Sequence, residues 1–378
     1  MIPLTAEQLA DVVGGDLLPG ADPAAVVDDV VIDSRGARPG SLFVALAGER
    51  TDGHAFLGDA LERGATLCMV DARRAHETAT PAVAVDDCAD GLLGLGRWAR
   101  DTAAPQVVAI TGSSGKTTTK DLLAAAVGAS RDTVATPGSY NNELGVPLTC
   151  CALTLTSEVL VAEVGARGIG HVAALAAVLR PDVAVVTMIG GAHLEQFGSL
   201  EGVAQAKGEL VEALDPDGIA VLNADDRLVA GLARRTAARV VTYGLGSDAE
   251  WRAEDVRLDR WARARFRVRG VDVALPMPGA HHVGNALAAL AAADAVGVDL
   301  AAAAEGLERA RLSPGRSALV ETTDGVTVLD DAYNANPASM AAALRTLAAL
   351  SVSGRRWAVL GRMAELGPTG VQEHERIG

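Results

Sequence analysis

The stretch Val107-Val108-Ala109-Ile110-Thr111-Gly112-Ser113-Ser114-Gly115-Lys116-Thr117-Thr118-Thr119 decides the fold of this chain. Its apolar beginning predicts a β-strand, and the residues 122–127 that follow it predict a helix. Glycines between a strand and a helix let backbone N–H groups surround an anion, and the helix N-terminus adds the positive end of its dipole. Lys116 is then expected to reach the terminal phosphates of ATP or GTP, and Thr117 to bind Mg²⁺. The alternative is an ordinary Gly/Ser turn before a helix.

The glycine spacing is shorter than in the general phosphate-loop motif G-x-x-x-x-G-K-[ST]. Ile110 occupies the place of the first glycine, and Gly112 lies three residues before Gly115. Fewer proteins share the shorter form, so it is the more informative one.

Length, charge and composition limit the possible functions. The 378 residues are too many for one hydrophobic core, so two or three domains are expected. A net charge of −15 argues against nucleic acid as a partner, because binding a phosphate backbone needs a basic face. The first residues do not resemble a secretory signal, and no apolar run approaches the roughly 18 residues that cross a membrane. We therefore expect a cytoplasmic enzyme without membrane insertion, and the four cysteines, which lack metal-ligand spacing, fit a reducing compartment.

The order of apolar and polar segments predicts an α/β chain of three blocks. Residues 1–86 alternate short β-branched runs with helical stretches, as in a small α/β domain. Residues 100–310 alternate strands and helices repeatedly, which is typical of a doubly wound, mostly parallel sheet with ligands at the carboxyl ends of its strands. The central strands are expected at 107–111, 159–164, 183–189, 218–223 and 240–243.

The last block, residues 311–378, predicts a partial domain. It offers a strand at 326–330, a helix at 338–350 and a strand at 357–360, which are too few elements for a closed domain. We therefore expect a truncated, Rossmann-like C-terminal domain.

Two residues that follow predicted strands are candidate metal ligands. Glu163 closes its strand beside the expected phosphate loop, where a carboxylate can bind Mg²⁺; the alternative is a solvated or helix-capping glutamate. His193 follows the next strand, and a single histidine is more often structural than a ligand. It becomes a candidate only through its neighbours.

Lys207 lies on the apolar face of a helix predicted over residues 199–214. At 100° per residue it shares that face with Leu200, Val203, Ala204, Leu210, Val211 and Leu214, whereas Glu201, Gln205, Glu209 and Glu212 face the other way. A buried ammonium is costly unless it is paired, neutral or chemically altered. Lys207 is therefore either a lysine whose amine reaches solvent or a functional residue.

Further polar segments lie on predicted loops. The segment Asp330-Asp331-Ala332-Tyr333-Asn334-Ala335-Asn336-Pro337 collects carboxylates and amides at a strand end. Arg316 follows Pro314-Gly315 at the border of the last two blocks, where it would bind a phosphate after closure or merely cap a helix. Near the beginning, residues 33–35 and 51–54 form polar turns compatible with a phosphate- and hydroxyl-rich ligand.

Taken in order, these segments resemble the Mur ligase family of peptidoglycan synthesis, over essentially the whole chain. The phosphate loop and lysine are shared with folylpolyglutamate synthase, whereas Asn141-Asn142 and residues 330–337 are similar to the members that add D-alanyl-D-alanine to UDP-N-acetylmuramoyl-tripeptide. The other matching segments are Asp33-Ser34-Arg35, Pro39 to Leu46, Thr111 to Lys120, Glu143 to Pro147, Glu163 to Ala166, Ala192 to Glu195, Ala206 to Glu209 and Leu360 to Gly367.

The resemblance implies three domains: one for the UDP-sugar, a central ATPase, and one that closes over ATP and receives the dipeptide. It implies an ATP-dependent ligase that acts as a monomer, with ATP and Mg²⁺ as cofactors. The tripeptide carboxylate would attack the γ-phosphorus of ATP, and the dipeptide amine would attack the resulting acyl phosphate.

The resemblance also implies roles for particular residues. ATP would be bound by Gly112, Ser113, Ser114, Gly115, Lys116, Thr117, Thr118, Asn285 at the adenine, Arg316 at the γ-phosphate and Asp331 at the ribose. Metal ions would be bound by Thr117, Glu163, His193 and Lys207, the last carbamylated by CO₂, and the catalytic residues would be Lys116, His193 and Lys207. The UDP-sugar would be bound by Ser34, Arg35, Asn141 and Asn142.

Two positions depart from the family pattern: Ser114 stands where asparagine is usual, and Arg362 where aspartate is usual. Two other functions therefore stay open, a nucleotide-binding remnant without ligase activity and a related ligase such as folylpolyglutamate synthase. The sequence leaves the third residue of the tripeptide, lysine or diaminopimelate, undetermined.

Overall fold

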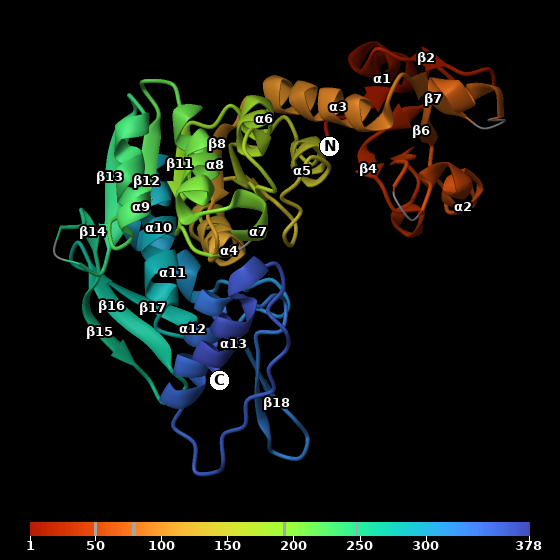
Figure 1. Cartoon of the computed structure of the whole chain (residues 1–378). Coiled ribbons are helices and arrows are strands. Elements are labelled where there is room, and N and C mark those ends of the chain that lie inside the picture. Colours follow the sequence, from red (N-terminus) through yellow and green to blue (C-terminus); the bar gives the residue numbers. More distant parts are fainter. Residues whose placement is uncertain (49–50, 78–80, 192–193, 247) are drawn as a thin grey trace. The chain divides into compact units, whose positions relative to one another are not determined.

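The computed structural model describes residues 1–48, 51–77, 81–191, 194–246 and 248–378. The chain forms two compact units (Figure 1). The first comprises Met1–Pro105 and Tyr140–Leu160, and the second comprises Gln106–Ser139 and Val161–Gly378. Each unit is described by itself.

The first unit is built on a five-stranded sheet in the order β2-β7-β6-β5-β4. Its strands are β2 (Asp16–Leu17), β4 (Asp29–Val31), β5 (Ser41–Val44), β6 (Leu67–Asp71) and β7 (Ala82–Val85). The pairs β4–β5, β5–β6 and β6–β7 are parallel, and β2 joins β7 antiparallel. Strands β5 and β7 are buried along their whole length, as continuous apolar runs predict for a sheet covered on both faces. A small antiparallel pair, β1 (Leu4–Thr5) and β3 (Val26–Val27), forms a separate sheet whose Leu4 and Val27 share the core of this one.

Helices α1 (Ala6–Val13), α2 (Leu57–Glu62), α3 (Cys88–Ala103) and α5 (Gly145–Cys151) complete this unit. A capping box between Thr5 and Gln8 starts α1, and the Asp87 side chain caps α3. Helices α3 and α5 pack closely at Gly96, where a Cβ atom would lie 2.7 Å from the Cα of Pro147. Four free cysteines, all buried, belong to this unit, as expected for small core residues.

The second unit contains a seven-stranded sheet in the order β14-β13-β12-β11-β8-β10-β9. Its strands are β8 (Gln106–Thr111), β9 (Thr133–Ala135), β10 (Val159–Glu163), β11 (Val183–Val186), β12 (Ile219–Asn223), β13 (Arg239–Gly244) and β14 (Trp251–Arg252). The pairs from β8 through β11, β12 and β13 to β14 are parallel. The chain order therefore reverses next to β8, so the carboxyl end of β8 opens at a switch point of the sheet, where such sheets bind ligands.

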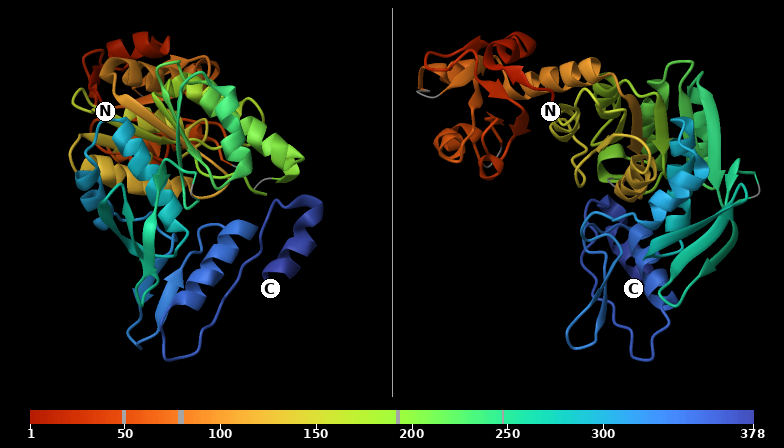
Figure 2. Two further views of the ribbon diagram at one scale, coloured as in Figure 1. Left: turned by 90° about the vertical axis from the view of Figure 1, so that its left-hand side faces the viewer. Right: turned by 180° about the vertical axis from the view of Figure 1, so that it is seen from behind.

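Helices cover both faces of this sheet (Figures 1 and 2). Contacts join α6 (His171–Leu179), α8 (Leu200–Glu212) and α9 (Arg227–Gly231) in one layer, and α4 (Lys116–Gly128), α10 (His282–Ala295) and α11 (Leu300–Glu308) in another. A short helix, α7 (Leu194–Phe197), precedes α8. Ten residues of the alanine-rich α10 are buried, because small side chains let it pack against both α4 and the sheet.

The second unit also contains a small antiparallel sheet, a hairpin and the helices that follow it. An antiparallel sheet joins β15 (Glu254–Leu258), β16 (Arg263–Val268) and β17 (Val271–Pro278), and β16 alternates buried and exposed residues so that its arginines line one solvated face. A hairpin of β18 (Ala318–Glu321) and β19 (Thr327–Asp330) precedes α12 (Pro337–Ala349), and α13 (Gly370–Ile377) ends the described chain. Asn336 and Ser339 form the capping box of α12.

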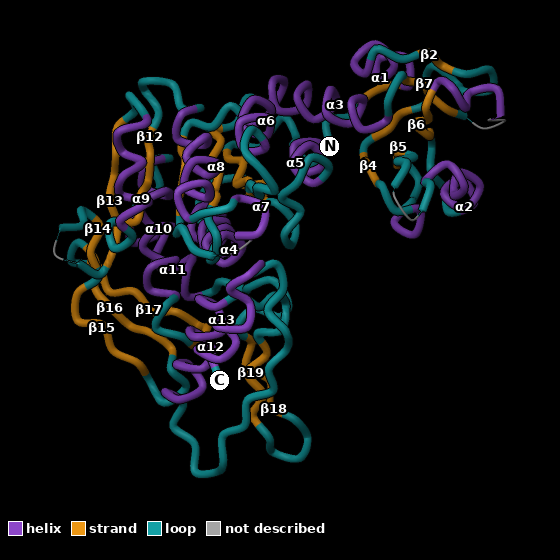
Figure 3. Tube along the Cα trace, in the orientation of Figure 1, coloured by secondary structure: helices purple, strands orange, loops and turns teal. Residues whose placement is uncertain are grey.

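This α/β architecture confirms the predicted fold class, but one predicted element is wrong. Residues 357–360 form a loop between α12 and α13, as Figure 3 shows, and not a strand. Trp357 is 76% exposed and Val359 is 99% exposed. A strand needs a neighbour to bond its backbone, and within the described residues none pairs with this run. The sequence also missed β18, the partner of β19.

Candidate active site

The predicted phosphate loop joins β8 to α4 and contains two glycines, Gly112 and Gly115, that a larger residue would replace only with strain. Gly112 has φ 150° and Gly115 has φ 84°, in the region that L side chains rarely adopt. A Cβ atom on Gly112 would overlap the Thr187 hydroxyl, and one on Gly115 would lie 2.6 Å from Asn285 Oδ1. The two glycines therefore allow the loop to turn tightly and allow its neighbours to approach its backbone.

Residues at the end of β11 hold the backbone of this loop. Thr187 Oγ1 donates to the Ser114 carbonyl at 2.6 Å, and the Ser113 N–H donates to the Met188 carbonyl at 2.8 Å. The Gly190 N–H donates to Ser113 Oγ at 2.9 Å. Thr187 was missed by sequence reasoning, and only its place at the end of an apolar strand could have pointed to it.

Lys116 begins α4 and folds back over the loop. Its Nζ donates to the Gly112 carbonyl at 2.9 Å. Burial lowers the pKa of Lys116, the Glu163 carboxylate opposes this, and the Arg316 guanidinium lowers the pKa further. The ammonium therefore lies within electrostatic reach of one carboxylate and one guanidinium, an arrangement suited to holding an anion such as a phosphate group.

Two residues near the phosphate loop, Glu163 and Thr117, carry oxygen atoms suited to a hard divalent cation. Glu163, at the carboxyl end of β10, is only 1% exposed, and its N–H donates to Thr136 Oγ1 at 3.0 Å. Thr117, the second residue of α4, is buried and accepts a hydrogen bond from Arg316 Nη2 at 3.3 Å. A carboxylate and a hydroxyl are ligands that Mg²⁺ prefers, so the chemistry of these residues fits the predicted metal.

Lys207 is buried on α8, as its position on the apolar face predicts. The Ser199 side chain caps this helix, and Lys207 is 3% exposed. Burial holds the pKa of Lys207 well below its usual value, and the Lys116 ammonium lowers it further. Within the described residues, no group forms a hydrogen bond or ion pair with the Lys207 amine.

Two predictions about the faces of this helix are wrong. Glu209 was expected on the polar face, but it is 8% exposed and accepts hydrogen bonds from the N–H groups of Gly170 and Ala173 at 2.6 and 3.0 Å. These bonds satisfy donors at the beginning of α6, so burial costs this carboxylate little. Leu200, expected on the apolar face, is 40% exposed because it begins the helix.

A cavity of about 700 Å³ in the second unit brings several predicted ATP-binding residues together. Among its lining residues are Ser114, Gly115, Thr118, Asn285, Arg316 and Asp331. Arg316 stacks over the Tyr333 ring at 4.0 Å, and burial raises the pKa of Asp331. Among the described residues, Arg316 Nε has no hydrogen-bond partner although it is buried. The structure thus brings together residues that lie over 200 positions apart in the sequence. His193 lies outside the described residues.

The four residues predicted to bind a UDP-sugar all belong to the first unit. Ser34 is buried, whereas Arg35 is exposed and forms an ion pair with Asp33 at 2.6 Å, which lowers the pKa of Asp33 to about 2. Asn142 Oδ1 accepts a hydrogen bond from the Gly145 N–H at 2.9 Å, at the start of α5. Asn141 lies beside it in the same turn.

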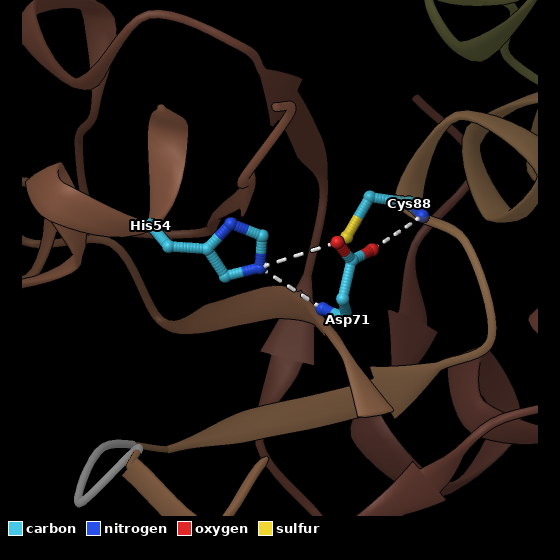
Figure 4. Close-up of side chains that lie close together, drawn as sticks. All are labelled: His54, Asp71 and Cys88. Atoms are coloured by element: carbon cyan, nitrogen blue, oxygen red, sulfur yellow. Dashed lines mark hydrogen bonds and ion pairs between the residues drawn. The ribbon is translucent and has the colours of Figure 1, made fainter. Parts of the chain in front are cut away.

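A second cluster of potential metal ligands, His54, Asp71 and Cys88, lies in the first unit (Figure 4). Both ring nitrogens of His54 are already used: Nδ1 bonds Asp52 Oδ1 at 2.9 Å, and Nε2 accepts from the Asp71 N–H at 3.0 Å. Asp71 Oδ1 accepts from the Cys88 N–H at 3.1 Å, and burial raises the pKa of the Cys88 thiol. Hydrogen bonds account for this cluster as a structural connection between β6 and α3.

Known proteins match the chain along its length. Residues 26–89 match "Mur ligase family, catalytic domain", residues 110–293 match "Mur ligase middle domain", and residues 315–378 match "Mur ligase, glutamate ligase domain". A relative from Mycobacterium tuberculosis (strain ATCC 25618 / H37Rv), called UDP-N-acetylmuramoyl-tripeptide--D-alanyl-D-alanine ligase, is 42% identical over 415 residues, which cover 100% of this chain and 81% of the relative. The chain belongs to the Mur ligase family.

Solved structures of Mur ligases have the same fold. One of MurF from Acinetobacter baumannii matches with a TM-score of 0.87 and 33% identity, covering 99% of this chain and 82% of that one. One of MurF ligase from Thermotoga maritima in complex with ADP matches with a TM-score of 0.78 and 31% identity, covering 93% and 81%. The three-domain Mur ligase architecture predicted from the sequence is thereby confirmed.

Membership of the Mur ligase family makes this chain an ATP-dependent ligase that acts on small molecules, as predicted. The ADP in the Thermotoga structure favours ATP over GTP as the nucleotide of the phosphate loop. A nucleotide-binding remnant and a folylpolyglutamate synthase are both disfavoured, since relatives that match the whole chain carry the name of one Mur ligase. None of the described helices is long and apolar enough to cross a membrane.

Proposed function

We propose that this Mur ligase joins D-alanyl-D-alanine to UDP-N-acetylmuramoyl-tripeptide at the expense of ATP, in the synthesis of peptidoglycan precursors. The observation that carries the proposal is the match of the whole chain, at 42% identity, to a relative named for this reaction. The electrostatic influence of Glu163 on Lys116, and of Lys116 on Lys207, supports it, because cations and a carboxylate at a phosphate loop can hold a nucleoside triphosphate with metal.

The phosphate loop and the cavity would bind ATP. Backbone N–H groups of residues 112–118 and the Lys116 ammonium would hold the phosphates. The cavity residues would complete the site, with Asn285 at the adenine, Asp331 at the ribose and Arg316 at the γ-phosphate. The unpartnered Nε of Arg316 supports its role, since a buried guanidinium nitrogen lacks a protein acceptor among the described residues.

Thr117 and Glu163 would hold one Mg²⁺, and His193 with carbamylated Lys207 a second. Bound Mg²⁺ supplies positive charge that offsets the repulsion between the attacking carboxylate and the phosphates. A carbamate forms when a neutral amine adds to CO₂ and releases a proton, which turns a cationic ligand into an anionic one. The burial of Lys207 beside Lys116, without a protein partner among the described residues, supports this modification.

The reaction would proceed in two steps at this site. The tripeptide carboxylate attacks the γ-phosphorus, ADP leaves, and an acyl phosphate forms while Lys116 stabilises the charge on the transferred group. The dipeptide amine then attacks the acyl carbon, phosphate leaves, and the amine loses a proton. Ser34, Arg35, Asn141 and Asn142 would hold the UDP-sugar, and closure of the last block would keep water away from the acyl phosphate.

We also infer the division into 1–86 for the UDP-sugar, 100–310 for ATP and 311–378 for closure. A monomer in the cytoplasm, where ATP is available, is consistent with four free buried cysteines.

The test is release of phosphate from ATP by the purified chain. Phosphate release is expected only when the UDP-muramoyl tripeptide and D-alanyl-D-alanine are both present, with the product mass equal to the joined substrates. Tripeptides ending in lysine and in diaminopimelate form two arms of the assay and decide between them. A Lys116→Met variant serves as the inactive control. Absence of phosphate release with both substrates present, or stimulation by a folate instead, would overturn the proposal.

A further inference from the structure

Five polar side chains of the second unit join α4, α10 and the loops around β18 and β19 through four consecutive hydrogen bonds. Thr119 Oγ1 lies 3.4 Å from Asn285 Oδ1, and Asn285 Nδ2 lies 3.3 Å from His282 Nδ1. His282 Nε2 lies 3.1 Å from Ser317 Oγ, which in turn lies 3.4 Å from Asp331 Oδ1. The chain of bonds thus runs from the helix of the phosphate loop to the predicted ribose-binding carboxylate.

The donor and the acceptor of every hydrogen bond in this series follow from Asp331, the last residue of the series. A carboxylate only accepts, so the Ser317 hydroxyl donates to Asp331 and its oxygen accepts from His282 Nε2–H. His282 Nδ1 then carries a lone pair and accepts from the Asn285 amide nitrogen. The Asn285 carbonyl oxygen is left to accept from Thr119. All four bonds are satisfied together when His282 is neutral with its proton on Nε2.

The surroundings of His282 keep it neutral. The side chain is 2% exposed, and the His281 ring lies with its centroid 3.9 Å away. Burial holds the pKa of His282 well below its ordinary value, and the neighbouring His281 lowers it further. Three charged groups surround this site. Asp331 reaches His282 through Ser317, and Arg316 is the residue before Ser317. Arg345 lowers the pKa of His281.

Ser317 has an unusual backbone that points to a function. Its φ of 46° lies in the left-handed region that non-glycine residues rarely adopt, and the residue is 4% exposed. Its N–H donates to Asp331 Oδ1 at 2.9 Å, and its hydroxyl pairs with His282. Strained residues persist where the surroundings fix them. The contacts with Asp331 and His282 hold Ser317 in this conformation. Ser317 directly follows Arg316, the predicted γ-phosphate ligand.

We propose that His282 is a positioning residue for the nucleotide. Its neutral ring connects Asn285 on α10 to Ser317, and Ser317 sets the backbone of Arg316 and the carboxylate of Asp331. The side chains expected at the adenine, the γ-phosphate and the ribose are thereby placed as one group. The inference rests on the proposed nucleotide contacts, but not on which carboxylate and amine the enzyme joins.

The test measures ADP and ATP affinity by isothermal titration calorimetry, together with kcat, the KM for ATP and the unfolding temperature. His282→Phe keeps a buried ring and removes both hydrogen bonds, so ATP affinity is expected to fall about tenfold with a higher KM. His282→Gln retains a donor toward Ser317 and an acceptor toward Asn285, and is expected to restore most of the affinity.

Ser317→Gly separates positioning from stability. Glycine adopts a φ of 46° without strain, which offsets part of the cost of the two lost hydrogen bonds, so the unfolding temperature is expected to change little. Nucleotide affinity is still expected to fall several-fold because the hydroxyl is lost. The double variant with His282→Phe is expected to bind no more weakly than His282→Phe alone, since both changes break one chain of bonds.

Full affinity in Ser317→Gly, or additive losses in the double variant, would overturn the inference. A His282→Phe variant that unfolds earlier yet keeps its KM for ATP would do so as well, since that result indicates a purely structural role. If His282→Phe does not fold, His282→Gln and Ser317→Gly carry the test. Calorimetry needs neither peptide substrate, so the inference can hold even if the proposed ligation is not found.

Discussion

Lys120 and Lys207 are two lysines with equal burial and opposite surroundings. Each is 3% exposed, and each lies on a helix that packs on the central sheet. Lys120 Nζ donates to the Thr136 carbonyl at 2.8 Å and pairs with Asp121 at 2.5 Å. Lys207 forms neither kind of contact with the described residues, and its pKa is lowered by burial and further by the Lys116 cation.

The difference teaches what a buried lysine does in this fold. A buried ammonium must be paired or lose its charge. Lys120 is paired, and it also bonds Thr136, whose hydroxyl accepts from the N–H of Glu163, a predicted metal ligand. Lys207 has no such partner among the described residues, and we therefore propose that it is modified and binds metal. The chain contains only three lysines, and Lys116 is the third.

The largest expected effect is on catalysis. Lys207→Met should lower kcat by about a thousandfold, equal to about 4 kcal/mol of barrier, because the proposed Mg²⁺ ligand is lost. Its stability should stay equal or rise, since methionine fills the apolar site without a charge. Steady-state phosphate release and urea unfolding check both results. A Lys207→Met variant with the activity of the parent chain would contradict the proposed difference in function between Lys207 and Lys120.

Lys120→Met should instead affect folding. It leaves the Thr136 carbonyl and the Asp121 carboxylate without their partner, which should cost about 2–3 kcal/mol of unfolding free energy. Asp121 also accepts from the N–H and the hydroxyl of Ser313, and so keeps these two bonds. Urea unfolding at neutral pH measures the loss. A variant as stable as the parent chain would show that these contacts contribute little.

Removing CO₂ should remove a modification from Lys207 and leave Lys120 unchanged. Activity is expected to fall several-fold in degassed, bicarbonate-free buffer and to return when bicarbonate is added. With ¹³C-labelled bicarbonate, NMR should show one carbamate carbonyl resonance that disappears in Lys207→Met. Carbamate formation needs a free neutral amine, which the ion-paired Lys120 does not offer. A resonance that persists in Lys207→Met would assign the modification to another amine.

The smallest expected effect comes from a third buried base, His282. Its folded pKa is depressed, so below about pH 6.5 the unfolded chain binds a proton that the folded chain does not, and stability should fall with pH. The neighbouring His281, with its pKa lowered to about 4, should act the same way between pH 4 and 6.5. The raised pKa of Asp331 opposes this as pH falls. Unfolding curves of the parent and of His282→Gln isolate the contribution of His282, which should appear as a flatter profile in the variant.

Local sequence was enough for the elements that depend on neighbours in the chain. The alternation of strands and helices, the loop at Gly112 and Gly115, the burial of Lys207 and the cap at Ser199 are set by periodicity, glycine conformations and local hydrogen bonds. Local sequence misplaced Glu209, because its partners lie on α6, and residues 357–360, because a strand exists only beside another strand.

The sequence by itself determined that a nucleotide-binding α/β chain contains one lysine on an apolar helix face and polar residues at its strand ends. Only the tertiary structure decided which of these residues meet. Thr187 supports the phosphate loop, Lys120 is paired whereas Lys207 is not, and His282 connects Asn285 to Ser317 and Asp331. The physical reason is that a periodic pattern specifies the face a side chain takes, whereas hydrogen bonds and charge pairs form between groups brought together by packing over long sequence distances.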